Sequence, residues 1–258
     1  MKQSRLALSL LLALALGCGG SGGDFNLISI EEEWQLGQQL SQDIARQVPL
    51  NNDPAVNAYI REMGQRIVSQ TNMANLPWNF HVVNDNEINA FAIPGGHVYI
   101  HTGLIKAASN ASEVAGVMAH EISHVLARHS TEQISRQYGL SVLAGVVLGQ
   151  NPGVLQQLAA QIVAGGALAR FSRQAEEEAD SLGLQAMNLA GYNPNGMVTM
   201  FQKLLANRRS SPGAVERFFS THPLTEDRIQ DTQRRIQSLP QRSTITNDAG
   251  FDQIRARV

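Results

Sequence analysis

A mostly apolar stretch between residues 114 and 126 carries two histidines and a glutamate, and it limits the possible folds of this chain more than any other segment. The sequence His120-Glu121-Ile122-Ser123-His124 lies within it. The apolar side chains around these residues are Val114, Ala115, Val117, Met118, Ala119, Ile122, Val125 and Leu126. At 3.6 residues per turn they cover most of a helix circumference, which predicts a buried helix. Because ionisable side chains are costly to bury alone, the histidines and the glutamate need polar partners.

The spacing of these polar residues predicts a metal site. His120 and His124 are four residues apart, so their imidazoles share one helix face and can bind one ion. Zinc with three protein ligands keeps a fourth position for water and lowers the pKa of that water to about 7. Glu121 lies about 100° further round, where it can accept the proton as the water attacks a carbonyl carbon. We therefore expect one zinc ion, with Glu121 as general base; a surface helix that carries these residues by chance is the alternative.

The first residues of the chain have the pattern of a secretory signal. Lys2 and Arg5 precede an apolar run over residues 6–16, which is shorter than the roughly 20 residues of a transmembrane helix. The run leads into Ala-Leu-Gly-Cys, which resembles a bacterial lipobox ending at Cys18. We expect residues 1–17 to be a signal peptide and Cys18 to carry lipid. An ordinary signal peptide that happens to contain a cysteine is the alternative.

The rest of the chain divides into a tether, one domain and a tail. Residues 18–25 contain a Gly/Ser run, which is typical of a flexible tether. Residues 26–240 are long and apolar enough for one sizeable domain, and residues 241–258 form a polar segment that we expect to be loosely held. The net charge of −2 and the lack of Lys/Arg runs give no reason to expect nucleic acid or a basic membrane patch.

Both helices and strands are expected before the metal motif. Residues 28–47 and 54–70 have helical periodicity, whereas Phe80–Val83 and Phe91–His101 are rich in aromatic and β-branched residues. Pro94-Gly95-Gly96 predicts the turn of a β-hairpin within the second of these segments. An edge strand here would pair with an extended peptide; a hairpin that only closes the core is the alternative.

Two apolar segments follow the metal motif. Residues 140–149 and 154–168 are separated by Gln150-Asn151-Pro152-Gly153, and neither segment is long enough to span a bilayer. They predict a helical hairpin near the site. Core packing is the simplest role, and a lid or a surface that meets membrane or substrate is the alternative.

A zinc hydrolase site needs one more protein ligand. One class of enzymes with this motif uses a histidine six residues after the second motif histidine. That position is Ser130 here, and His129 is one residue away, about 140° round a continuous helix from His124. We therefore excluded that class.

An acidic segment further along offers the other common solution, a glutamate from a later helix. Glu176 and Asp180 share one helix face, whereas Glu177 and Glu178 turn away. Taken alone, this pattern is also that of a solvated acidic helix face, since charged residues usually face water.

Four motifs in order resemble one metallopeptidase family. They are Asn89-Ala90-Phe91-Ala92 with Pro94-Gly95-Gly96, His120-Glu121-x-x-His124, Ser172-Arg173-x-x-Glu176-x-Glu178-Ala179-Asp180-x-x-Gly183, and Ser220-Thr221-His222-Pro223 with Arg228. This combination resembles the family that contains the CAAX prenyl endopeptidases, HtpX and the BepA-type periplasmic proteases. The resemblance implies a predominantly helical α+β, zincin-like fold with a small sheet beside the metal. It also implies Glu176 as third zinc ligand and Asp180 as the residue that orients a ligating histidine.

The same resemblance extends to two later residues. It implies that His222 approaches the zinc, either filling the fourth position at rest or stabilising the oxyanion; a structural histidine is the alternative. We expect Arg228 to pair with Asp180 or with a substrate carboxylate. Four other histidines were left out of the expected site: His81, His97, His101 and His129.

These patterns together predict a zinc endopeptidase of the bacterial cell envelope. We expect it on the periplasmic side, attached to the outer membrane only through the lipid at Cys18. Its expected substrates are extended or unfolded proteins held along Asn89, Ala90, Phe91 and Ala92. The alternative is an envelope assembly factor or chaperone that binds client proteins and seldom cleaves them.

Overall fold

The computed structural model describes residues 26–165 and 170–258. The expected signal peptide and the whole expected tether, including Cys18, therefore lie outside the described residues. Within those ranges, the structure has no helix of sufficient length and apolarity to cross a membrane.

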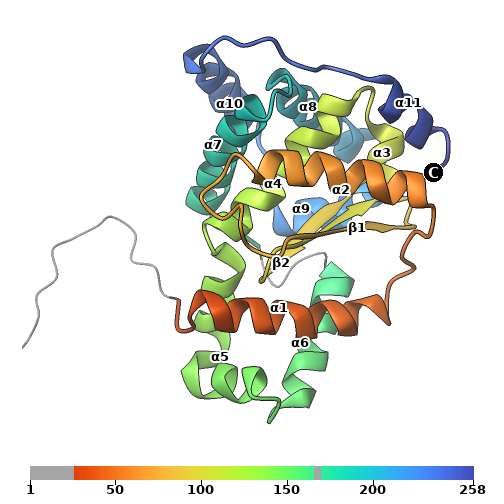
Figure 1. Ribbon diagram of the computed structural model, residues 1–258. Helices are drawn as coiled ribbons and strands as arrows, with labels where there is room; N and C mark the ends of the chain where they lie inside the picture. Colours follow the sequence, from red (N-terminus) through yellow and green to blue (C-terminus); the bar gives the residue numbers. More distant parts are fainter. Residues whose placement is uncertain (1–25, 166–169) are drawn as a thin grey trace, which may run out of the picture.

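A three-stranded sheet lies between two groups of helices (Figure 1). The strands are β1 (Asn79–Val83), β2 (Ala90–Ile93) and β3 (His97–His101), in the spatial order β1-β3-β2. β1 runs parallel to β3, and β2 pairs antiparallel with β3. Gly95 and Gly96, both with positive φ, form the turn between β2 and β3. The predicted β-hairpin is therefore present, and β2 is an edge strand.

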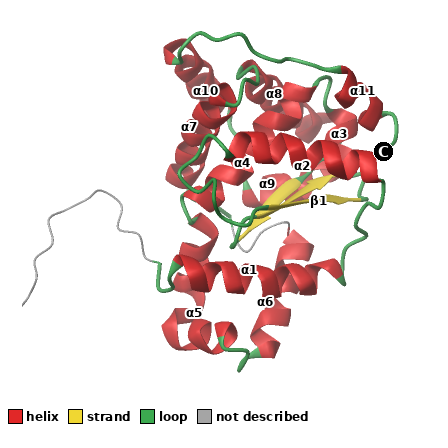
Figure 2. Cartoon of the chain, viewed as in Figure 1, coloured by secondary structure: helices red, strands yellow, loops and turns green. Residues whose placement is uncertain are grey.

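Most of the chain is helical, as Figure 2 shows. The helices are α1 (Ile30–Ala45), α2 (Pro54–Val68), α3 (Thr102–Ala107), α4 (Ala111–Leu126), α5 (His129–Val147), α6 (Pro152–Gly165), α7 (Arg173–Leu189), α8 (Asn195–Ser210), η1 (Pro212–Val215), α9 (Glu216–Thr221), α10 (Glu226–Ser238) and α11 (Ala249–Arg255). This arrangement confirms the expected class, a predominantly helical α+β fold with a small sheet.

The sheet separates two hydrophobic clusters because successive side chains of a strand point to opposite faces. Ala90 and Ala92 of β2 belong to the larger cluster, which contains apolar residues of α2, α4, α7 and α8. Phe91 and Ile93 belong to the smaller cluster, with residues of α1, α5 and α6. All four β2 side chains are consequently buried.

Helix α4 is the central helix of the larger cluster. Its residues from Ala111 to Val125 are all buried, and the Asn110 side chain caps its first turn by accepting a hydrogen bond from the Glu113 backbone. Gly183 of α7 lies against this helix, where an added Cβ would approach the Ala119 carbonyl carbon to 3.1 Å. The missing side chain lets α7 come close to α4.

The predicted helical hairpin corresponds to α5 and α6. Pro152 starts α6, but α5 begins at His129, well before the apolar segment. Gly139 has a φ of 71° and interrupts the regular helix there. The first half of α5 is therefore a separate helical piece that follows α4 directly.

The end of the chain differs from our expectation. We predicted a loosely held polar tail over residues 241–258, yet Phe251 and Ile254 of α11 are buried in the larger cluster. Tyr59 of α2 donates a hydrogen bond to the Asp248 carboxylate at 2.9 Å. Two apolar side chains three residues apart, on one face of this short helix, pack it against the larger cluster, although its overall composition is polar.

Candidate metal centre

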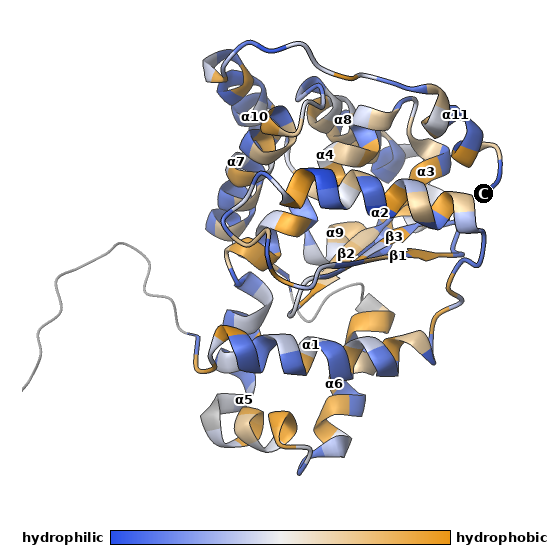
Figure 3. Ribbon diagram, viewed as in Figure 1, coloured by the Kyte–Doolittle hydropathy of each residue, from blue (hydrophilic) through white to orange (hydrophobic). Residues whose placement is uncertain are grey.

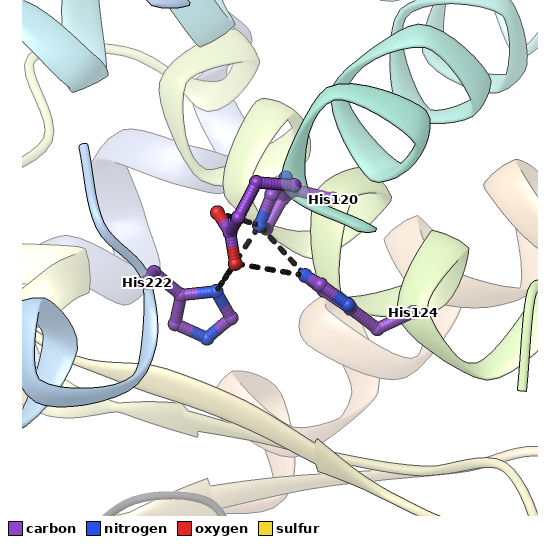
Figure 4. A group of neighbouring side chains, drawn as sticks. His120, His124 and His222 are labelled. Atoms are coloured by element: carbon purple, nitrogen blue, oxygen red, sulfur yellow. Dashed lines mark hydrogen bonds and ion pairs between the residues drawn. The ribbon is translucent and has the colours of Figure 1, made fainter. Parts of the chain in front are cut away.

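Helices α4 and α7 bring three potential metal ligands together. The Nε2 atoms of His120 and His124 lie 3.1 Å apart, and each lies 3.6 Å from an oxygen of the Glu176 carboxylate. None of the three residues is more than 1% exposed. Figure 4 shows the two imidazoles turned toward one another, with dashed lines to a shared carboxylate.

These distances fit a tetrahedral ion. Zinc bonds of about 2.0–2.1 Å place neighbouring ligand atoms of a tetrahedron about 3.3 Å apart, close to the values observed here. His120, His124, Glu176 and His222 each offer one ligand atom, and these four atoms all lie within 4.8 Å of one another. Two imidazole nitrogens and a carboxylate are also the donor set that suits a catalytic zinc ion. The residues present therefore fit the expected metal.

His222 contributes the third imidazole of the group. It follows α9 and precedes Pro223, and its backbone N–H bonds to the Phe218 carbonyl at 2.8 Å. Its Nδ1 lies 3.0 Å from the Glu176 carboxylate and 3.3 Å from Nε2 of His120. The sequence left open whether this histidine reaches the site, and the structure puts its ring among the ligand atoms.

A buried ion-pair network supports the ligands from behind. Nδ1 of His120 lies 2.9 Å from the Asp180 carboxylate, the geometry by which a carboxylate fixes a ligating imidazole. Arg228 of α10 donates to both Asp180 oxygens, at 2.8 and 2.9 Å, and also pairs with Glu176. The expected pair between Arg228 and Asp180 is therefore present, and the contact with Glu176 was not foreseen.

The network determines the charge of the two acids. Burial alone would raise the pKa of Asp180, but Arg228 and His120 hold it below its ordinary value. Burial likewise opposes ionisation of Glu176, yet His222, His120 and Arg228 lower its pKa. Both groups are therefore carboxylates at neutral pH, and Glu176 can offer an anionic oxygen to a cation.

Glu121 lies on the sheet side of the group. Its carboxylate is 3.5 Å from Nε2 of His222 and accepts a hydrogen bond from the Ala92 backbone of β2. Burial raises the pKa of Glu121 above its ordinary value, against the lowering effect of His222 and His120. A raised pKa suits a group that must accept a proton and then return it.

The predicted substrate strand lies directly beside Glu121, but it is covered. Asn89, Ala90, Phe91 and Ala92 are at most 6% exposed. Both polar atoms of the Asn89 amide are buried without a hydrogen-bond partner among the described residues. In this conformation, the strand and the ligand group are both closed to solvent.

Comparison with known proteins shows which family this chain belongs to. A family model described as "Peptidase family M48" matches residues 54–236. The chain belongs to peptidase family M48. M48 metallopeptidases are metal-dependent, so the family and the ligand group of the structure agree on a metal. The resemblance stated from the sequence motifs is thereby confirmed.

Several curated M48 relatives cover most of this chain. The "Beta-barrel assembly-enhancing protease" of Escherichia coli strain K12 is 35% identical over 244 residues, which cover 86% of this chain and 47% of that protein. The "Putative beta-barrel assembly-enhancing protease" of Vibrio cholerae is 34% identical over 224 residues, 83% of this chain and 46% of that protein. The "Mitochondrial metalloendopeptidase OMA1" of Schizosaccharomyces pombe is 30% identical over 209 residues, 80% of this chain and 61% of that protein. The chain thus spans about half the length of its bacterial M48 relatives.

Sequence reasoning missed the contact that His129 makes. Its Nδ1 lies 2.9 Å from Nδ1 of His124, and its Nε2 lies 3.4 Å from Glu178. We had extended one helix through His129, but α4 ends at Leu126 and Arg128 adopts a left-handed φ of 57°. The reversal turns His129 back onto the metal motif, where it contacts the outer nitrogen of His124. A signal for the end of α4 would have been needed to predict this contact, and the sequence has no glycine or proline at that point.

A second group of acids with a histidine lies on the loop side of the sheet. Asp85, Glu87 and His101 are close enough to hold an ion. However, Arg217 of α9 already pairs with Asp85 at 3.1 Å and with Glu87 at 3.0 Å. Because this guanidinium already pairs with both acids, we assign no metal here. The pairs instead fasten α9, which leads to His222, to the loop between β1 and β2.

The contact between Asp180 and His120 predicts a change in metal affinity. Asp180→Asn removes the charge that orients the His120 ring, so metal affinity should fall about 10–100-fold, as for other ligand-supporting residues. Competition with a chromophoric chelator measures this affinity. Asp231→Asn is the matched control, since Asp231 lies on α10 and pairs only with Arg234 and Arg235 in the contacts described. Equal affinities for the two variants would contradict the role of Asp180.

Proposed function

We propose that this M48 peptidase is a zinc-dependent endopeptidase that cleaves unfolded or misassembled proteins in the bacterial cell envelope. The observation that carries the proposal is the convergence of His120, His124 and Glu176 on one point, with Glu121 beside it. The family and the names of its relatives, a protease and a metalloendopeptidase, support peptidase chemistry.

The residues around the metal position have separate tasks. His120, His124 and Glu176 would hold zinc, which supplies a Lewis acid for the scissile carbonyl and lowers the pKa of water. Glu121 accepts the proton of the attacking water and then delivers it to the leaving amine nitrogen. Its burial and raised pKa support both transfers. Asp180 and Arg228 keep His120 and Glu176 in place throughout the reaction.

His222 occupies the space that a reacting water needs. Its ring lies between Glu121, at 3.5 Å, and Glu176, at 3.0 Å. Burial opposes protonation of this imidazole, but the two carboxylates raise its pKa above the ordinary value. We assign it to the resting state, in which it fills the position beside Glu121. Oxyanion stabilisation by the same ring is the second possibility from the sequence.

Strand β2 is the proposed substrate partner. It is an edge strand, and Ala92 already contacts Glu121 through its backbone. An extended peptide paired with β2 would therefore run past the catalytic carboxylate. The amide of Asn89, which has no partner among the described residues, would gain one from such a peptide.

The proposed location follows from the sequence of the N-terminus. A signal peptide over residues 1–17 and lipid at Cys18 would hold the domain on the periplasmic side of the outer membrane. Relatives named for β-barrel assembly support an envelope role. Because this chain spans about half of their length, we carry over no particular substrate from them.

A second function deserves a test because the site is closed. An assembly factor or chaperone would bind clients without needing access to Glu121, and the ligand group here is at most 1% exposed. The two functions predict different effects of a Glu121 substitution: a peptidase would lose its activity, whereas an assembly factor would keep its function.

Glu121→Gln should keep the metal and lose hydrolysis. The amide cannot accept the proton of water, so the cleavage rate of an unfolded test protein should fall by about 10²–10⁴-fold. The cleavage rate is measured from the loss of the intact test protein on a gel or from the release of a fluorescent fragment. The metal content is measured by elemental analysis. Glu177→Gln is the matched control, because Glu177 is an exposed acid paired with Arg173. Cleavage at the parental rate in Glu121→Gln would contradict the mechanism, and full envelope function in that variant would favour the chaperone.

His222→Ala separates the two roles of that histidine. If the ring fills the reaction position at rest, its removal should raise the cleavage rate of an unfolded protein several-fold. If it stabilises the oxyanion, kcat should instead fall by about 10²–10³-fold with little change in KM. We expect the rise. Steady-state kinetics decide between the two, with circular dichroism and metal content showing that the variant is folded and loaded.

A further inference from the structure

The segment from the middle of α5 to the end of α6 lacks charge over an unusual length. No Asp, Glu, Lys or Arg occurs from Gln137 to Ala169, although charged residues make up 16% of the chain, so about five would be expected there. Arg136 and Arg170 are the first charges on either side. A helical hairpin on a water-exposed surface normally carries charged side chains.

The hairpin is not fully buried by the rest of the fold. Its inner side packs on α1 and β2 through Leu143, Leu158 and Ile162. The turn between α5 and α6 points away from the body, beyond α1 in Figure 1. Leu148 in this turn is 69% exposed, the more exposed of two large hydrophobic side chains that stand out at the surface of the described residues. Figure 3 shows apolar segments on both helices.

Three half-buried apolar side chains lie at the end of α5 and the start of α6, on either side of this leucine in the chain. Val147, Val154 and Leu155 pack only partly against the smaller cluster. Together with Leu148 they give the uncharged end of the hairpin an apolar part, beside the exposed polar side chains of Gln150, Gln156 and Gln157. Apolar groups at the surface are unfavourable in water, and burying each one contributes roughly in proportion to its area.

The chain enters the fold beside the first half of α5, which leads into the hairpin. The Leu27 backbone donates to Ser135 of α5 at 3.2 Å, and Arg128 donates to the Ile28 carbonyl at 2.7 Å. Cys18 precedes Leu27 by nine residues. At about 3.3–3.6 Å per residue, that length reaches at most about 30 Å. A lipid on Cys18 would therefore keep α5 close to a bilayer.

We propose that the end of the α5–α6 hairpin, formed by Val147, Leu148, Val154 and Leu155, is a docking surface for the lipid bilayer. It inserts shallowly at the interface, where an uncharged end avoids the cost of moving charges out of water. The closeness of the hairpin to a bilayer rests on the lipid at Cys18, which is part of the proposed function. The exposed apolar surface is independent of that lipid.

This docking would orient the peptidase on the membrane. α5 follows the metal motif directly, and α6 packs on the face of the sheet that contains Phe91 and Ile93. One surface contact would then fix the position of β2 and of the metal group relative to the bilayer.

Fluorescence quenching by brominated lipids tests the proposal. The full chain is purified with its cellular N-terminus and reconstituted on phosphatidylethanolamine/phosphatidylglycerol vesicles with bromine on the acyl chains. In the Leu148→Trp variant, the fluorescence that the new tryptophan adds to that of the parent protein should be mostly quenched by the brominated lipids. Leu189→Trp is the matched control, since Leu189 is the other exposed large hydrophobic residue, at 42%, and lies at the end of α7. Trp34 and Trp78 are buried, so the parent protein provides the baseline.

The outcomes separate the docking surface from the anchor. The mass of the N-terminal peptide reports lipidation of Cys18 independently of quenching. Quenching at position 148 but not at 189 supports docking, whether or not Cys18 carries lipid. Equal emission with and without bromine at position 148 overturns it. A second outcome would also overturn the proposal: vesicles leave the tryptophan at position 148 open to quenching by aqueous acrylamide, whereas an unfolded protein protects it. That result would assign the surface to a protein partner.

Discussion

The burial of charged and polar groups between α4 and α7 is the constraint on which this structure depends. His120, His124 and Glu121 lie in a helix whose every face is covered, so each needs a partner within the protein. Glu176 and Asp180 on one face of α7 supply two of these partners, and Gly183 allows the helices to approach closely enough. Arg228 then forms ion pairs with both carboxylates. A metal ion would complete the same arrangement by taking up the remaining lone pairs.

Much of this arrangement could be predicted because it depends on periodicity. A spacing of four residues fixes which side chains share a helix face, so His120 and His124, and likewise Glu176 and Asp180, could be paired from the sequence. The aromatic and β-branched residues of Phe91–His101, with the Pro94-Gly95-Gly96 turn, similarly predicted a β-hairpin. The convergence of α4 with α7 is not periodic, and only the resemblance to a family connected Glu176 with the motif.

What the sequence did not predict depends on local backbone turns and on long-range packing. The left-handed Arg128 ends α4 and returns His129 to His124, and no turn-forming residue marks that position. The bridge from Arg228 to Glu176 joins helices far apart in the chain. Residues 241–258 looked polar and loose, yet Phe251 and Ile254 of α11 are buried in the larger cluster. In each case, the structure depends on a few specific contacts that the composition and periodicity of the segment do not reveal.

The location of the bound metal tests the central claim most directly. Crystals of the metal-loaded protein, measured on both sides of the zinc absorption edge, reveal the ion by its anomalous scattering. Our account predicts one zinc ion per chain, bonded to Nε2 of His120, Nε2 of His124 and the Glu176 carboxylate. An ion bound at Asp85, Glu87 and His101 instead, or a Glu176 carboxylate that makes no bond to the metal, would contradict it.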